Sequence, residues 1–133
     1  MKLPGNRTYL GFTLVEIMIV ASVIALLAAI CVPSFLRARK RSQATKVLED
    51  LRIIDQATDQ YAVETNKTTG MHPVFTDLKT YMKANTRLYN TGRDIFNRRY
   101  GPTFTVDTYP RVPTRTYSAL SDVADTNFWS PYN

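Results

Sequence analysis

Residues 12–36 have the sequence FTLVEIMIVASVIALLAAICVPSFL, and this stretch decides the fold. Glu16 is its one charged residue. As an α-helix rising about 1.5 Å per residue, the stretch would be roughly 37 Å long and could cross a hydrocarbon core of about 30 Å. A cleavable secretory signal has a shorter apolar region of about 7–15 residues. The stretch therefore predicts a membrane-spanning helix, in which Cys31 is a small apolar residue.

The rest of this 133-residue chain is polar and leaves room for one small head. One cysteine and one histidine, His72, exclude a disulfide within the chain and a Cys/His zinc site. His72 has no nucleophile elbow near it, so we expect a surface residue and no catalytic residue. The sequence therefore predicts a protein that is not an enzyme.

The net charge is +6, and its densest cluster is residues 37–41, with the sequence RARKR. This cluster lies directly after the apolar stretch. The position favours anionic lipid head groups over nucleic acid as a partner. For the net charge as a whole, we favour a basic tilt spread over a solvated surface.

The residues Gly11-Phe12-Thr13-Leu14-Val15-Glu16 resemble the prepilin cleavage and methylation motif of type IV pilins and type II secretion pseudopilins. The resemblance covers residues 5–64. It implies a leader at residues 1–11, cleavage between Gly11 and Phe12 by a prepilin peptidase, and methylation of the new Phe12 amine. A small residue at the cut site also lets a protease approach the backbone closely.

Glu16 stands out within the apolar stretch. A charged carboxylate at mid-bilayer costs about 2.5–3.5 kcal/mol on insertion scales, and less nearer an end. The head-group zone could solvate Glu16, which lies near the start of the stretch. In the family that the motif resembles, this residue is the fifth of the mature chain. The Phe12 amine of a neighbouring subunit would be its natural partner, because pairing offsets the desolvation of both charges, and we therefore assign Glu16 to assembly.

The resemblance also implies partners and a location. We expect a structural subunit of a type II secretion pseudopilus, or alternatively of a type IV pilus for adhesion, motility or DNA uptake. Its partners would be copies of itself, other pilin-like subunits, the prepilin peptidase, an inner-membrane assembly platform and the lipid bilayer. It would cross the bacterial inner membrane once with its head in the periplasm, or lie in a periplasmic or extracellular filament. The lone cysteine favours a pseudopilin over a disulfide-closed major pilin.

The basic residues leave a second class of protein open. Two of them precede the apolar stretch and four follow within five residues of its end, so the positive-inside rule places the C-terminal part in the cytoplasm. A signal-anchored membrane protein with a ligand-binding head would fit that charge bias. We follow the motif, because specific enzymes recognise it whereas the charge bias is a tendency.

Pro33 falls where the family has a helix-kinking proline, and a proline inside a helix removes one backbone hydrogen bond. Beyond it, apolar or small residues recur in steps of three and four from Ala44 to Ala62. The pattern predicts one long helix with a membrane half at residues 12–36 and an amphipathic half at residues 37–65.

Residues 66–133 are predicted to form a small head, which makes the fold class α+β. Thr76–Ala84 should be a short helix with Thr76 as its N-cap. The segments 103–109 and 114–120 are rich in β-branched and aromatic residues. They predict a small antiparallel sheet, a hairpin that packs against the long helix.

Two groups of polar residues in the head could bind a ligand. Asp122 and Asp125 could hold calcium through oxygen, in a stretch that is faintly similar to the calcium loop of major pseudopilins. No calcium-loop spacing is met, so we expect no cofactor and keep calcium as the alternative. A basic and aromatic group could bind single-stranded nucleic acid, although we favour solvated charge there. That group consists of Arg98, Arg99, Tyr100, Arg111 and Arg115.

Overall fold

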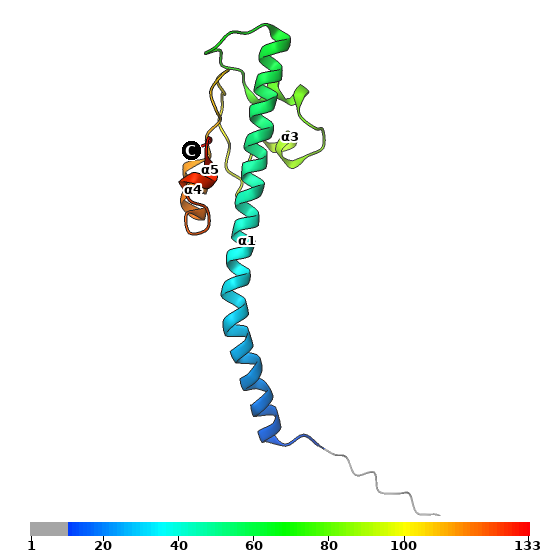
Figure 1. Ribbon diagram of the computed structural model, residues 1–133. Helices are drawn as coiled ribbons and strands as arrows, with labels where there is room; N and C mark the ends of the chain where they lie inside the picture. The colour runs from blue at the N-terminus through cyan, green and yellow to red at the C-terminus, as the bar shows by residue number, and fades with distance from the viewer. Residues whose placement is uncertain (1–10) are drawn as a thin grey trace, which may run out of the picture. The chain divides into compact units, whose positions relative to one another are not determined.

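The computed structural model describes residues 11–133, which contain one long helix and five short ones (Figure 1). The long helix, α1, is Leu14–Thr65. The short helices are α2 (Phe75–Leu78), the 3-10 helix η1 (Lys79–Tyr81), α3 (Arg87–Thr91), α4 (Thr114–Leu120) and α5 (Thr126–Trp129). The chain divides into two compact units, Met1–Leu36 and Arg37–Asn133, and α1 contributes to both.

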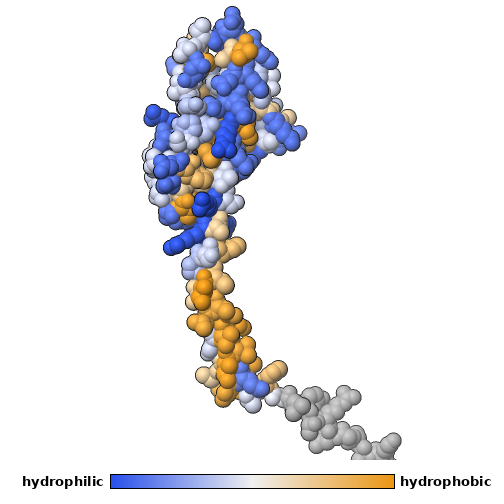
Figure 2. Space-filling model, viewed as in Figure 1, coloured by the Kyte–Doolittle hydropathy of each residue, from blue (hydrophilic) through white to orange (hydrophobic). Residues whose placement is uncertain are grey.

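The first half of α1 is helical, as predicted, and its apolar side chains are uncovered. Every large apolar side chain from Phe12 to Leu36 is at least 50% exposed. Figure 2 shows these residues as an apolar surface along the visible face of the helix. Within residues 11–133, α1 is the one helix long and apolar enough to cross a membrane. Apolar surface of this extent needs cover from lipid or from other helices.

The second half of α1 is amphipathic, as its periodicity predicted. Its buried residues, some of them adjacent pairs, recur at intervals of three or four positions and form one stripe. They are Ala44, Val47, Leu48, Asp50, Leu51, Ile54, Ala57 and Thr58. Asp50 is the one charged residue among them.

α1 ends at Thr65, the last residue of the predicted amphipathic half. Asn66 adopts a left-handed conformation with φ of 51°. The Lys67 amide donates to the Ala62 carbonyl at 3.0 Å. This is the bond of a Schellman cap, which satisfies a carbonyl that the helix end would otherwise leave open.

The head folds around the second half of α1, with α3 on one side of the helix and α4 and α5 on the other (Figure 1). The side chains that are most completely buried come from α1, from the short helices and from the loop before α4. They are Trp129, Leu51, Ile54, Leu78, Leu120, Val47, Thr116 and Asp94. The C-terminus is fixed to the head because the Val112 amide donates to the Tyr132 carbonyl at 2.9 Å.

The predicted helix at Thr76–Ala84 is present in a shorter form. It begins as α2 and continues as η1, so its first residue is Phe75 and its N-cap is Val74, not Thr76. The Asp77 carboxylate accepts a hydrogen bond from the Val74 amide at 3.1 Å, which stabilises this earlier start. Leu78 of α2 is fully buried in the core.

The predicted hairpin is wrong, and the small antiparallel sheet is not confirmed. Residues 114–120 form helix α4, and residues 11–133 contain isolated β-bridges but no strand. The segment 103–109 pairs instead with residues 70–74: the Phe104 amide donates to the Pro73 carbonyl, and the Val106 amide to the Met71 carbonyl, both at 3.0 Å. Helix α4 forms because Pro113 supplies a φ compatible with a helix start and because Thr116 and Leu120, four residues apart, are both buried.

Candidate functional site

The candidate site lies at the start of α1, where Thr13 and Glu16 cap the helix. The Thr13 amide donates to Glu16 Oε2 at 2.8 Å, and the Thr13 hydroxyl donates to the same oxygen at 3.0 Å. The Glu16 amide in turn donates to Thr13 Oγ1 at 3.2 Å. This reciprocal arrangement is a capping box, which satisfies backbone donors that a helix N-terminus leaves open.

The capping role of Thr13 is a feature that the sequence prediction missed. Its signal is the spacing Thr-x-x-Glu directly before an apolar run. The acid also lies in the first turn, where the positive end of the helix dipole stabilises a negative charge. Glu16 therefore has a local role that does not depend on a second subunit.

The cap uses only one of the two carboxylate oxygens of Glu16. All hydrogen bonds that the carboxylate accepts within residues 11–133 go to Oε2. An ionised carboxylate has about four lone-pair sites, so Oε1 can accept from an external cation while Oε2 still caps the helix. Capping and pairing with a neighbouring amine are thus compatible.

The cleavage-site residues Gly11 and Phe12 lie just before α1 and are exposed. A Cβ atom added at Gly11 would have no neighbour within 4 Å. The Phe12 side chain is 83% exposed. The predicted leader, apart from Gly11, lies outside the described residues. Pro33 lies inside α1, nineteen residues after its start.

The calcium candidates Asp122 and Asp125 have other partners in the structure. Lys40 Nζ donates to Asp122 Oδ2 at 2.6 Å, and this hydrogen bond lowers the pKa of Asp122. Asp125 caps α5, because its Oδ1 accepts from the Phe128 amide at 2.9 Å. In the described part of the chain, no three His, Cys, Asp or Glu side chains are grouped to hold a metal.

The basic and aromatic group in the head does not form a stacking surface. Tyr100 is only 7% exposed, so its ring is not available to a base. The Arg98 guanidinium lies over the Phe96 ring, 5.5 Å from its centroid. His72 is exposed, and its Nδ1 lies 3.0 Å from the Thr105 hydroxyl.

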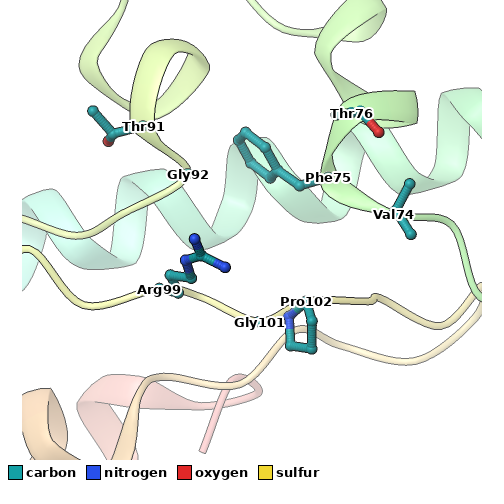
Figure 3. Close-up of a pocket in the computed structure, with 8 residues that line it drawn as sticks. All are labelled: Val74, Phe75, Thr76, Thr91, Gly92, Arg99, Gly101 and Pro102. Carbon is teal, nitrogen blue, oxygen red and sulfur yellow. The ribbon is translucent and has the colours of Figure 1, made fainter.

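A groove of about 290 Å³ in the head is lined by residues near α2, α3 and the 99–102 segment (Figure 3). Arg99 is the one charged residue that lines it. Gly92 has φ of 61°, and a Cβ atom there would lie 3.2 Å from the Phe75 ring, so this position favours glycine. The lining holds no acid, histidine or cysteine that could act on a substrate.

The buried polar pair of the head joins Asp50 of α1 to Tyr100. The Tyr100 hydroxyl donates to Asp50 Oδ2 at 2.9 Å, and Lys46 Nζ lies 3.8 Å from Asp50 Oδ1. Burial raises the pKa of Asp50, although the Tyr100 hydroxyl and the charges of Lys46 and Arg87 oppose the change. An acid whose pKa is raised in the folded state stabilises most below its unfolded pKa, and this contribution is lost as the pH rises through the folded pKa.

The Asp50→Asn variant should therefore gain stability relative to the unmodified chain as the pH rises from 4 to 7. Asparagine keeps an acceptor for Tyr100 and carries no charge to bury. Tyr100→Phe removes the donor and should destabilise the head by about 1–3 kcal/mol. Thermal unfolding of the full-length chain in neutral detergent measures both effects. A difference between Asp50→Asn and the unmodified chain that is equal at the two pH values would contradict this account.

The start of the chain matches the family model for the prokaryotic N-terminal methylation motif over residues 6–32. Several curated proteins are similar to about half of the chain, among them two pilins and a secretion core protein. The type IV wide pilus major component PilA4 of Thermus thermophilus is 40% identical over 64 residues, which are 48% of this chain and 49% of that protein. The type IV major pilin protein PilA of Myxococcus xanthus is 36% identical over 64 residues, 48% of this chain and 28% of that protein.

The third relative, the type II secretion system core protein G of Aeromonas hydrophila, is 30% identical over 62 residues, which are 47% of this chain and 43% of that protein. The chain thus spans about half the length, or less, of the curated relatives that it matches. No solved structure matches the chain. The start of the chain thus carries the prokaryotic N-terminal methylation motif, and about half of the chain is similar to type IV pilins and to a type II secretion system core protein.

Proposed function

We propose that the chain is a structural subunit of a type II secretion pseudopilus or a type IV pilus-like filament, and that it is not an enzyme. The observation that carries the proposal is the apolar half of α1, whose large side chains are all at least half exposed. Lipid would cover this surface before assembly, and sister helices would cover it in the filament. The motif at residues 11–16 supports the same proposal, because this motif marks proteins that a peptidase processes before they assemble.

The proposed route has three steps. A prepilin peptidase cuts after Gly11 and methylates the Phe12 amine. The mature chain then waits in the inner membrane as a single-pass protein with its head in the periplasm. An assembly platform adds it to a filament, where Glu16 Oε1 accepts from the Phe12 amine of a neighbour. This contact would set the axial stagger between adjacent helices.

The relatives are consistent with both a type IV pilus and a type II secretion pseudopilus. Two of them are pilins and one is a secretion core protein. The lone Cys31 favours the pseudopilus, because the chain cannot close a disulfide within its head. Adhesion, motility or DNA uptake would be the roles of the pilus form.

The test is expression of the full-length chain together with a prepilin peptidase and an assembly platform. Mass spectrometry of the membrane-extracted protein should show a chain that begins at a methylated Phe12, and electron microscopy should show filaments. External protease should digest the head in intact spheroplasts. A head that is protected there would favour the alternative, a signal-anchored protein with a cytoplasmic ligand-binding head.

The Pro33→Ala variant tests the proposed kink. Proline lacks the amide that would bond the Ala29 carbonyl, so the helix should be looser and bent between these residues. Alanine should straighten the helix and leave membrane insertion unchanged. Distances between spin labels on either side of residue 33 would measure the change in the full-length chain. Equal distances in the two proteins would show that Pro33 does not bend the helix.

A further inference from the structure

A second groove is formed in part by the basic cluster at residues 37–41. It has a volume of about 370 Å³ and is lined by Arg37, Ala38, Arg41, Asp122 and Val123. Arg37 and Arg41 are one helical turn apart, so both side chains project from the same face of α1. A water molecule occupies about 30 Å³ in the liquid, so the groove can hold a phosphodiester group with room for water.

The charges around this groove are unbalanced. Asp122 is the one acid in its lining, and Lys40 already binds that carboxylate at 2.6 Å. The Arg37 charge acts on Asp122 more weakly than Lys40 does. Within residues 11–133, neither the Arg37 nor the Arg41 guanidinium donates a hydrogen bond to a protein acceptor. Two guanidinium groups thus face the groove with their donors available to a ligand.

We propose that this groove binds the phosphodiester of an anionic phospholipid, with Arg37 and Arg41 as the phosphate-binding residues. The guanidinium fork matches phosphate oxygens bidentately, and a weakly hydrated guanidinium suits the interface of a bilayer. Arg37 directly follows Leu36, the last residue of the apolar stretch, so the two side chains would lie at head-group depth. Lys40 pairs with the only carboxylate of the lining, which offsets the negative charge there.

This inference rests on the proposed insertion of residues 12–36 in a membrane and goes beyond the proposed filament. It gives the basic cluster a role on the side of the membrane where the positive-inside rule does not expect one. A soluble acidic protein fits the position less well, since it would have to reach a groove at the bilayer surface. The lipid is already present there.

The test is native mass spectrometry of the full-length chain in a neutral detergent. The probes are phosphatidylglycerol and phosphatidylcholine with the same acyl chains. Phosphatidylglycerol should bind about tenfold more tightly than phosphatidylcholine. The reason is that phosphatidylglycerol has a net negative charge, which the Arg37 and Arg41 guanidinium groups attract. The Arg37→Gln/Arg41→Gln variant should bind the two lipids equally. The matched control is Arg111→Gln/Arg115→Gln, which removes two exposed charges elsewhere on the head and should keep the preference.

Three results would overturn the proposal. The first is equal binding of the two lipids by the unmodified chain. The second is a similar loss of preference in both double variants, which would show an effect of net charge and not of a built groove. The third is release of the lipid by millimolar inorganic phosphate, which would assign the groove to soluble phosphate. Since no filament is needed for the measurement, failure here and failure of the filament proposal are separate observations.

Discussion

The Gly11→Val variant should accumulate as an uncleaved full-length precursor. Gly11 is exposed, and a Cβ atom there would meet nothing within 4 Å, so the substitution should not disturb the fold of residues 11–133. It should act only on the approach of the peptidase, which needs close access to the backbone at the cut. Intact-mass measurement of the membrane fraction should show nearly complete loss of the chain that begins at Phe12.

The matched control is Gly5→Val, which changes a glycine elsewhere in the same leader. This variant should be cleaved and methylated as the unmodified chain is. Cleavage of Gly11→Val at the normal rate would show that the small residue is not what the enzyme requires. A mature chain of the unmodified protein that begins at Met1 would exclude the proposed processing altogether.

The long helix could be predicted from the sequence because two independent periodic signals agree along it. The uninterrupted apolar run accounts for its first half, and the three-and-four spacing from Val47 to Thr58 accounts for the stripe that the head buries. The burial of Asp50 could not be predicted in the same way. Its partner Tyr100 is fifty residues away in the sequence, and only tertiary structure brings the hydroxyl to the carboxylate.

The head was harder to predict because its segments are short. Thr114–Leu120 contains two threonines and a tyrosine, which favour a strand by propensity. Propensity over seven residues is weak, and the burial of Thr116 and Leu120 against other elements decides for a helix. Thr116 also donates its hydroxyl to the buried Asp94 carboxylate, a contact across more than twenty residues. Tertiary contacts of this kind leave no local pattern in a sequence.

The role of Glu16 in assembly stays a prediction, and the structure adds a local partner for its carboxylate. The motif identified Glu16 as a residue that needs a partner, and a partner is present, but it is Thr13 of the same chain. The interpretation of Glu16 as an unsatisfied charge overlooked the capping box, whose two residues lie within the motif itself. The structure therefore raises a question that the sequence alone did not: whether assembly needs the negative charge of Glu16 or its helix cap.

Three variants separate these two roles. Glu16→Leu removes both the charge and the cap, Glu16→Gln removes the charge but keeps a side-chain acceptor for Thr13, and Thr13→Val removes the hydroxyl of the cap but keeps the charge. All three should insert in the membrane and be cleaved after Gly11. Leucine at position 16 should insert at least as well as glutamate, because it is more favourable in hydrocarbon.

If pairing with the Phe12 amine of a neighbour directs assembly, Glu16→Leu and Glu16→Gln should both fail to form filaments. Each would leave an amine buried without its partner, at about 3–5 kcal/mol per interface by analogy with soluble proteins. Thr13→Val should lower the filament yield less, since loss of a capping side chain costs about 0.5–2 kcal/mol and acts within one chain.

Filament counts by electron microscopy, with cleavage checked by mass on the same samples, give the comparison. Filaments from Glu16→Gln as abundant as those of the unmodified chain would show that the cap, and not the charge, is what assembly requires. Because the cap occupies Oε2 alone, we expect the opposite: Oε1 remains open to the amine in the unmodified chain, and only the ionised carboxylate can serve both donors at once.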